Sequence, residues 1–371
     1  MSWFLAERRL SRVLVTRLRY LGDIVMATAV IEALRHGDAG LEIGFLCEQT
    51  HAAVLTGHPD LARIHELDAR RRGSDARARV GSRLGMGAGT LAMVRELRDT
   101  RYDAAVDLFF NPRSAWLLWM AGIPARLAGP AGGRRHLFTH GSAPGTAAWP
   151  VDLAEVAPGG LGEHLSRLAP LVHGESGLSF ASWFRREGLR ATTRLAPRAG
   201  GRTGEPPPVL LAPGATWATK RWPVSHWREL AATLAAGQER PVRVLPPPGG
   251  SALAAAIADV QSAGDVKALP ESSLTEVLDH LAGAAGLVAV DGGIMHAAVA
   301  LGVPTLALFG PTDPGLWFPY EGSGPFRVLA TRPACHPCHL HECPAFVCLP
   351  ELQPATVADA AQALFRGEGE R

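Results

Sequence analysis

Two adjacent glycines, Gly292 and Gly293, lie between two sequence patterns that together suit an anion. The apolar residues 287–290 before them favour a β-strand, and the residues after them favour a short helix. Glycine lets the backbone approach a ligand closely. The first turn of the helix presents free N–H groups and the positive end of the helix dipole. Of the common anionic groups, a diphosphate fits this arrangement best.

A polar loop at residues 213–222 provides a second set of groups for phosphate. It follows a predicted strand at 209–212, and Pro223 after it suits the first turn of a helix. The loop is not a P-loop, because no glycine precedes its lysine at the required spacing. A solvated basic turn is the alternative explanation. The loop carries two hydroxyls and two cations, from Thr216, Thr219, Lys220 and Arg221.

Asp23 is the candidate for proton transfer. It follows a predicted strand at 13–16 and a turn at Gly22, and apolar residues recur at helical spacing from 24 to 34. The carboxyl ends of strands in open α/β sheets face the ligand crevice. Aspartate is also a favoured helix N-cap, so both a catalytic and a structural role stay open for Asp23.

The elements that position these groups alternate between strand and helix in both halves, which predicts parallel sheets flanked by helices. Further strands are predicted at 43–47, 104–108, 242–245 and 305–309. A chain of 371 residues is long enough for two domains. Residues 195–207 lack apolar periodicity and favour a linker. We therefore expect an N-terminal domain at 1–194, a second domain at 208–350, and a C-terminal helix within 351–371.

Composition and motifs argue against several classes of protein. The formal net charge of +2 is too small to predict a nucleic-acid partner. The glycines at 85, 87 and 89 lack the spacing of a dinucleotide-binding oxidoreductase and follow no predicted strand. No signal peptide is evident, because charged residues at 7–9 interrupt the apolar residues 3–5, so we expect a cytoplasmic protein. An arginine-rich run at 70–83 suits a solvated loop or contact with anionic lipid head groups.

Four of the five cysteines are close together near the C-terminus, with histidines among them. In a cytosolic chain this density suggests metal before disulfide. The second pair lacks the usual Cys-x2-Cys spacing of a structural zinc site, so free thiols in a structural loop are the alternative. The group consists of Cys335, Cys338, Cys343 and Cys348, and the fifth cysteine, Cys47, suits a buried apolar position.

The three segments together resemble glycosyltransferase family 9, the bacterial ADP-heptose:lipopolysaccharide heptosyltransferases. The resemblance is carried by Leu21-Gly22-Asp23, by Pro213-Gly214-Ala215 with Lys220-Arg221-Trp222-Pro223, and by Asp291-Gly292-Gly293-Ile294-Met295-His296 with Phe309-Gly310-Pro311-Thr312-Asp313-Pro314. Residues 107–126 also resemble a family segment, and the cysteine-rich tail is similar to that of heptosyltransferase II members. The matches follow the family's order from residue 12 to about 365.

This resemblance implies a GT-B fold, in which two Rossmann-like α/β domains with parallel sheets face a cleft and the C-terminal helix returns toward the N-terminal domain. It implies inverting transfer of heptose from ADP-heptose to the inner core of lipopolysaccharide, with no cofactor required. Asp23 would be the general base. Asp291 would face sugar hydroxyls, which carboxylates accept well. The diphosphate would be held by Thr216, Thr219 and Lys220, and by backbone N–H groups of Gly292, Gly293, Ile294 and Met295.

The implied acceptor is a Kdo-lipid A type inner core, whose phosphate and carboxylate groups need cations in the N-terminal half. Only Arg113 of the candidates matches a family segment, and each of them suits an ordinary surface charge equally well. Because the acceptor is a lipid, peripheral contact with the inner membrane is expected. The candidates are Arg17, Arg19, Arg113, Arg134 and Arg135.

One turn departs from the family pattern. Members often have a Gly-Gly-Pro-x-Glu turn after the strand matched by 242–245, where the glutamate is expected to bind ribose, whereas this chain has Pro246-Pro-Pro-Gly-Gly-Ser251. The nucleotide base, the sugar, the acceptor hydroxyl and the oligomeric state therefore do not follow from the sequence. Two other functions stay open: a sugar-nucleotide epimerase of similar two-domain build, and a non-catalytic nucleotide-sugar binding protein.

Overall fold

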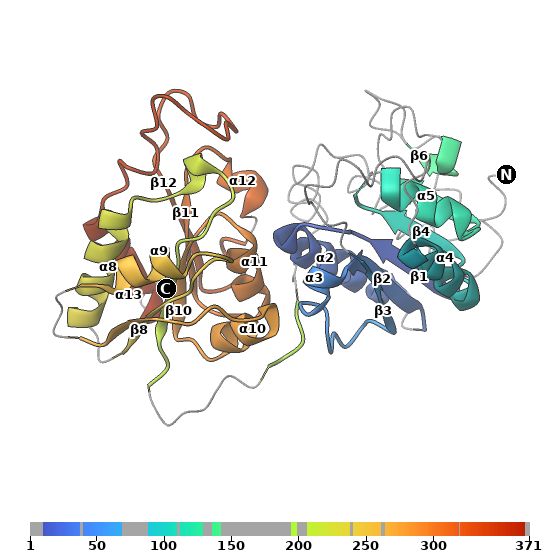
Figure 1. Cartoon of the computed structure of the whole chain (residues 1–371), viewed down its shortest axis with the longest axis horizontal. Coiled ribbons are helices and arrows are strands. Elements are labelled where there is room, and N and C mark those ends of the chain that lie inside the picture. Colours follow the sequence, from blue (N-terminus) through green and yellow to red (C-terminus); the bar gives the residue numbers. More distant parts are fainter. Residues whose placement is uncertain are drawn as a thin grey trace. The chain divides into compact units, whose positions relative to one another are not determined.

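The computed structural model describes residues 10–37, 40–68, 88–109, 112–128, 136–141, 194–198, 206–237, 240–260, 264–318 and 320–367. The chain divides into two compact units, Met1–Glu187 and Gly188–Arg371. Each unit contains one six-stranded sheet, and every strand pairing in both sheets is parallel (Figure 1). The predicted α/β architecture with a parallel sheet in each half is confirmed.

The sheet of the first unit has the order β3-β2-β1-β4-β5-β6. Its central strand pairs on both sides, with Val13 opposite Ile43 and Ala104. A strand buried on both faces needs a continuous apolar run, which is why the strand at 13–16 could be predicted from the sequence. The strands are β1 (Arg12–Thr16), β2 (Glu42–Glu48), β3 (Arg63–Leu67), β4 (Ala104–Asp107), β5 (Ala125–Ala128) and β6 (His140–Gly141). The helices are α2 (Leu21–Gly37), α3 (Gln49–Ala52), α4 (Ala88–Thr100) and α5 (Pro112–Met120).

The sheet of the second unit has the order β12-β11-β10-β7-β8-β9. Its strands are β7 (Val209–Ala212), β8 (Val242–Val244), β9 (Val266–Ala268), β10 (Gly286–Val290), β11 (Thr305–Phe309) and β12 (Phe326–Ala330). A 3-10 turn, η4 (Ala218–Lys220), follows β7. The α-helices are α8 (Val224–Gly237), α9 (Ser251–Ala258), α10 (Leu274–Ala282), α11 (Gly293–Ala300), α12 (Pro314–Trp317) and α13 (Pro354–Phe365).

Both sheets follow one topology. In chain order within each unit, the strands lie 3-2-1-4-5-6 across the sheet, so the direction of winding reverses between the first and the fourth strand. Ligands of such sheets bind beyond the carboxyl ends of the strands at this reversal. The expected ligand edges are therefore the loops after β1 and β4 in the first unit, and the loops after β7 and β10 in the second.

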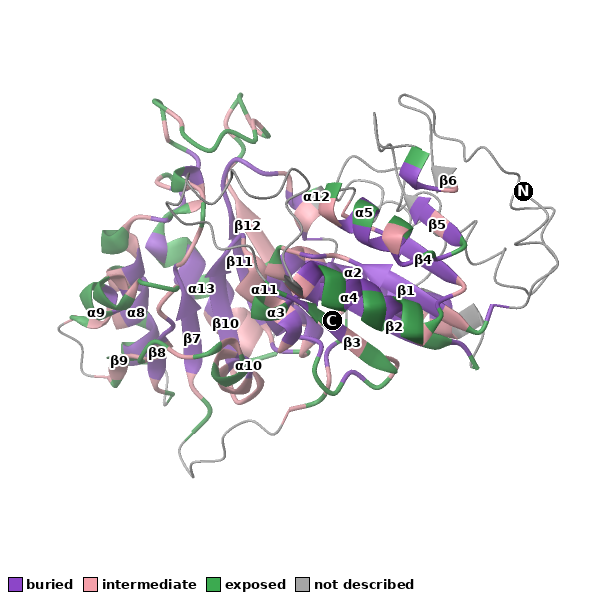
Figure 2. Cartoon of the chain, turned by 45° about the vertical axis from the view of Figure 1, so that its right-hand side comes forward, coloured by how far each residue is buried: buried purple, intermediate pink, exposed green. Residues whose placement is uncertain are grey.

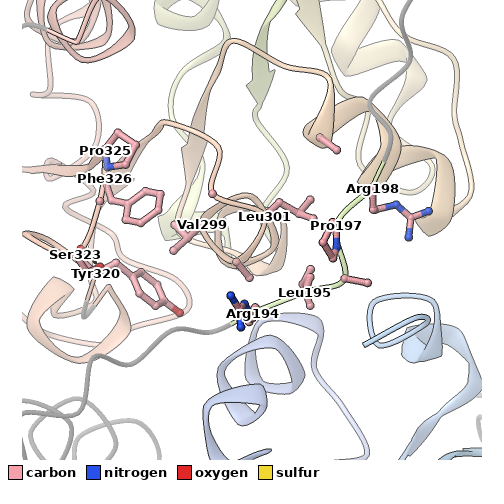
Figure 3. Close-up of a pocket in the computed structure, with 15 residues that line it drawn as sticks. Arg194, Leu195, Pro197, Arg198, Val299, Leu301, Tyr320, Ser323, Pro325 and Phe326 are labelled. Carbon is pink, nitrogen blue, oxygen red and sulfur yellow. Dashed lines mark hydrogen bonds between the residues drawn. The ribbon is translucent and has the colours of Figure 1, made fainter. Parts of the chain in front are cut away.

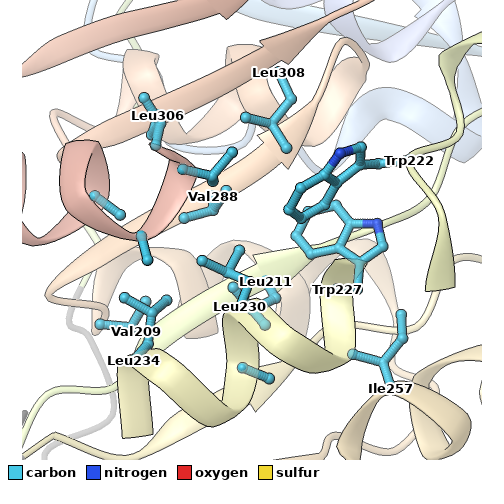
Figure 4. Packing of buried hydrophobic residues seen from close by; sticks show 14 of the residues in the cluster. Val209, Leu211, Trp222, Trp227, Leu230, Leu234, Ile257, Val288, Leu306 and Leu308 are labelled. Atoms are coloured by element: carbon cyan, nitrogen blue, oxygen red, sulfur yellow. The ribbon is translucent and has the colours of Figure 1, made fainter. Parts of the chain in front are cut away.

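Helices cover the second sheet and close its core. In Figure 2 the strands of both sheets are mostly buried, while the outward faces of the helices are exposed. Trp227 of α8 is fully buried and meets Trp222 edge to face, with ring centroids 5.0 Å apart (Figure 4). The Trp222 Nε1–H donates to the Leu352 carbonyl at 3.0 Å, which satisfies a polar group that burial would otherwise leave unpaired.

The last helix, α13, packs against α8 within the second unit. Its buried residues, which include Val357 and Ala361, belong to the same apolar core as β7, β10 and β11. The idea that this helix returns toward the N-terminal domain stays a prediction. In the described ranges, no helix is long and apolar enough to cross a membrane.

Candidate donor and acceptor sites

Three loops at the carboxyl edge of the second sheet meet around one buried carboxylate. Asp291 follows β10 and is only 5% exposed. Its Oδ2 lies 2.5 Å from the Nζ of Lys220, from the loop after β7, and accepts a 2.6 Å hydrogen bond from the Thr312 hydroxyl, from the loop after β11. The fold thus brings together two residues predicted for the donor site, Lys220 and Asp291, and adds Thr312, which sequence reasoning missed.

This geometry gives Asp291 a role that the sequence did not predict. One of its oxygens accepts bonds from Lys220 and Thr312, so the carboxylate orients the lysine, while its contact with sugar hydroxyls stays a prediction. Its other oxygen, Oδ1, makes no hydrogen bond within the described part of the chain, which leaves one acceptor position for a ligand. An ammonium held by a buried carboxylate is already positioned before a diphosphate arrives.

An aromatic pair flanks the same lysine. The Lys220 Nζ lies 4.2 Å from the centre of the Trp217 ring, within the range of a cation–π contact. Trp217 in turn stacks on His341, with ring centroids 3.8 Å apart and an interplanar angle of 25°. This pair could not be predicted from the sequence, because the two rings are more than a hundred residues apart in the chain.

The start of α11 supplies backbone donors beside this cluster. Gly292 is the N-cap residue, and because glycine has no side chain it does not cap the N–H groups of the first turn. A Cβ on Gly292 would lie only 3.7 Å from the Gly214 carbonyl oxygen, so the loops after β10 and β7 pass close together. His296 is buried and its Nδ1 is 2.8 Å from the Tyr320 hydroxyl, which makes it a packing residue.

The two predicted threonines have different surroundings. Thr216 is exposed, so its hydroxyl is accessible to a ligand. Thr219 is 2% exposed, and its hydroxyl donates to the Leu340 carbonyl at 2.6 Å. The predicted diphosphate contact of the Thr219 hydroxyl is therefore corrected: this group fastens η4 to the cysteine-rich segment.

We expect Thr219→Val to lower the free energy of unfolding by about 1 kcal/mol, because the hydrogen bond from the buried Thr219 side chain to the Leu340 carbonyl is lost. Affinity for ADP should change little, and Thr219→Ser should restore the stability. Denaturant unfolding and calorimetric titration with ADP give the two readouts. A tenfold loss of ADP affinity at unchanged stability would instead return Thr219 to the list of donor ligands.

The cysteine-rich segment supports both loops of this edge. The backbone N–H groups of Cys338 and His339 both donate to the Pro311 carbonyl, after β11, at 3.1 and 3.0 Å. All four cysteines are free thiols, and burial raises the pKa of Cys348. Among the residues described, no group of three or more histidine, cysteine or acidic side chains could hold a metal ion, so the zinc hypothesis finds no support.

At the carboxyl edge of the first sheet, Asp23 is paired with a residue predicted to bind the acceptor. Its Oδ2 accepts a 2.5 Å bond from the Arg17 guanidinium and a 3.4 Å bond from the backbone N–H of Tyr20. Asp23 lies in the first turn of α2, so it reaches back to the residue before the helix instead of being the N-cap itself. Within the described ranges its Oδ1 makes no hydrogen bond, which leaves an oxygen able to accept a proton.

The other predicted acceptor residues divide into two groups. Arg113 pairs with Glu48 at 3.2 Å and donates to the Asp68 carbonyl at 2.6 Å. It therefore connects the start of α5 to the end of β2 and to the residue after β3. The Arg19 guanidinium lies over the Phe109 ring, 5.6 Å from its centre. Arg134, Arg135 and the arginine-rich run at 70–83 lie outside the described residues.

A cavity of about 520 Å³ in the second unit lies away from these loops. It is bordered by residues 194–198, by the end of α11 and by the start of β12, at the amino ends of β11 and β12 (Figure 3). Its labelled lining is mainly apolar, with Leu195, Val299 and Phe326 among the side chains. We therefore locate the donor site from the loops that carry Lys220 and Asp291, not from this cavity.

Comparisons with known proteins show the family of this chain. Residues 90–345 match the family model described as glycosyltransferase family 9 (heptosyltransferase). The chain is 32% identical over 340 residues to lipopolysaccharide heptosyltransferase 1 of Pseudomonas aeruginosa, which covers 90% of this chain and 87% of that protein. It is 26% identical over 318 residues to lipopolysaccharide heptosyltransferase 2 of Escherichia coli K12, covering 82% and 84%. The higher identity to a type 1 enzyme does not favour the heptosyltransferase II subgroup suggested by the cysteine-rich tail.

Solved structures share the fold. The structure of E. coli ADP-heptose lipopolysaccharide heptosyltransferase II aligns with a TM-score of 0.67 at 21% identity, and the alignment covers 97% of this chain and 100% of that chain. The glycosyltransferase family 9 protein from Veillonella parvula aligns with a TM-score of 0.68 at 18% identity, covering 97% and 99%. The likeness to these structures establishes the fold of two Rossmann-like units.

Proposed function

Because this chain belongs to glycosyltransferase family 9, we propose that it transfers a heptose from ADP-heptose to the inner core of lipopolysaccharide, with inversion at the anomeric carbon. The observation that carries the proposal is the convergence of Lys220, Asp291 and the start of α11 at the strand reversal of the second sheet. A cation and a set of free N–H groups at that position suit a diphosphate. The two curated relatives described above are named lipopolysaccharide heptosyltransferases.

The second unit binds the donor in this proposal. The Lys220 ammonium, the exposed Thr216 hydroxyl and the N–H groups from Gly292 to Met295 contact the diphosphate. The free Oδ1 of Asp291 accepts from a sugar hydroxyl. These groups are fixed by the loops before the substrate binds, so they stabilise the charge that develops on the departing ADP without reorganising.

The first unit binds the acceptor and supplies the base. Asp23 takes the proton of the acceptor hydroxyl while that oxygen forms its bond to the anomeric carbon and the bond from that carbon to the ADP oxygen breaks. Arg17, paired with Asp23, orients the carboxylate, and Arg113, Arg134 and Arg135 are proposed for the anionic groups of the acceptor. A single displacement of this kind needs neither a covalent intermediate nor a cofactor.

The lipid anchor of the proposed acceptor implies work at a membrane surface. We propose peripheral contact with the cytoplasmic face of the inner membrane, in agreement with the proposed cytoplasmic location. The proposed acceptor half corresponds to residues 1–194 and the donor half to 208–350, joined by the 195–207 linker.

The function is tested by incubating the enzyme with ADP-heptose and a panel of truncated inner-core acceptors, with mass spectrometry of the acceptor and chromatography that separates ADP, ADP-heptose and its epimers. A transferase releases ADP and adds one heptose mass to an acceptor. An epimerase converts the donor with no acceptor present, and a binding protein converts nothing. Either of these two results would replace the proposal.

A further inference from the structure

The strand next to the donor loop ends without the acid that nucleotide-binding sheets usually place there. In doubly wound sheets, an acidic residue near the end of the second strand binds the ribose hydroxyls of a bound nucleotide. The second strand of this unit is β8, and it is followed by Leu245 and three prolines, then by Gly249 and Gly250. This turn contains no carboxylate.

A carboxylate reaches this turn from the neighbouring strand. Glu271 lies three residues after β9, and its Oε1 accepts a 3.1 Å hydrogen bond from the backbone N–H of Gly250. Glu271 is exposed, and its Oε2 makes no hydrogen bond within the described residues. One oxygen therefore anchors the side chain on the β8 turn, and the other is available to a ligand.

Close packing fixes the β8 turn beside the phosphate loop. A Cβ added to Gly214, in the loop after β7, would lie 2.6 Å from the Cβ of Pro247, and one added to Gly250 would lie 2.4 Å from the Cγ of the same proline. Pro247 is thus wedged between the two glycines. The turn that holds Glu271 is connected in this way to the loop that carries Lys220.

The β8 turn lies one strand away from the loop proposed to hold the diphosphate. Adjacent strands are about 4.8 Å apart, and β8 is the immediate neighbour of β7. A nucleotide whose diphosphate is held between β7 and β10 can extend its nucleoside across β7 to the β8 turn. The ribose is the part of the nucleoside next to the diphosphate, so it is the part that lies nearest to this turn.

We propose that the Glu271 carboxylate binds the ribose hydroxyls of the donor nucleotide, supplied from the β9 loop instead of from the β8 turn. This inference rests on the proposed function, because it assumes a ribonucleoside diphosphate at Lys220. Gly250 holds one oxygen of the carboxylate in place, and a carboxylate accepts from a neighbouring pair of hydroxyls. Glu271 thereby selects ribonucleotide donors over deoxyribonucleotides.

The test compares ADP with 2′-deoxy-ADP by calorimetric titration of the full-length protein and of Glu271→Gln. We expect the unmodified protein to bind ADP about tenfold more tightly than 2′-deoxy-ADP, as for a charge-assisted hydrogen bond. In Glu271→Gln the affinity for ADP should fall to near that for 2′-deoxy-ADP, so that the preference largely disappears. Glu276→Gln is the matched control, because Glu276 is an exposed carboxylate five residues away that bonds Ser273 at the start of α10; this variant should retain the preference.

The Gly250 N–H that Glu271 accepts from belongs to the N-cap residue of α9, and a purely capping role gives a different result. In that case Glu271→Gln lowers the melting temperature but keeps the preference for ADP over 2′-deoxy-ADP, which overturns the inference and leaves the proposed transferase intact. Equal binding of the two nucleotides by the unmodified protein does the same. A protein that binds neither nucleotide overturns the proposed ADP-sugar donor, and the role of Glu271 with it.

Discussion

Asp23→Asn should lower kcat by about 10²- to 10⁴-fold, the usual contribution of a general base. The substitution keeps the shape of the side chain and an oxygen that can accept from Arg17 and from the Tyr20 N–H, so the start of α2 should persist. It removes the carboxylate that takes the proton. Steady-state rates of ADP release with a truncated acceptor measure the loss, and titration with ADP should show an unchanged donor affinity.

A matched control separates loss of the base from loss of an ion pair. Arg35, on the same helix, pairs with Asp60 at 3.3 Å, and the two side chains are 30% and 26% exposed. Asp60→Asn removes that pair far from the start of α2, and kcat should stay within a few-fold of the unmodified enzyme. If Asp23→Asn retains its turnover, or loses it only in proportion to unfolded protein, Asp23 is a structural residue and the base lies elsewhere.

Lys220→Ala should have the second largest effect, and the structure predicts two separate losses. Removing a charge-assisted bond to the diphosphate should weaken ADP binding about ten- to a hundredfold. Removing the partner of Asp291, which is 5% exposed, should also lower the free energy of unfolding by about 3 kcal/mol, because a buried carboxylate is left with Thr312 alone. Denaturant titration and calorimetry measure the two losses.

The double variant Lys220→Ala with Asp291→Asn distinguishes the two causes. It removes both charges, so stability should recover most of the way toward that of the unmodified protein. ADP binding should stay weak if Lys220 contacts the diphosphate. Recovery of ADP affinity together with stability would show that the lysine serves only to neutralise Asp291.

The central strands could be predicted from the sequence for a physical reason. The side chains of Val13, Leu14, Val209 and Leu211 are 0% exposed, because parallel strands in the middle of a covered sheet have both faces in the core. Their segments are therefore continuous apolar runs. The glycine turn before α11 could also be predicted from local sequence, because its residue types and its position after a strand are sufficient.

The strands at the sheet edges escaped prediction for the opposite reason. The four edge strands are β3, β6, β9 and β12, and none was predicted. The β3 segment reads Arg-Ile-His-Glu-Leu and β9 reads Val-Lys-Ala, so polar side chains interrupt any apolar run. An edge strand is partly exposed, and its sequence does not need to be apolar throughout.

The partners of the site residues were decided by the tertiary structure alone. Lys220 and Asp291 are 71 positions apart in the chain, and Thr219 and Leu340 are 121 apart. Each belongs to a loop whose neighbours depend on the order of the strands, and local sequence carries no record of that order. The sequence by itself determined which segments end in polar loops able to bind anions and protons. Only the sheet topology, by setting the carboxyl ends of β7, β10 and β11 side by side, decided that Asp291 holds Lys220 and that the Thr219 hydroxyl is bonded to the backbone.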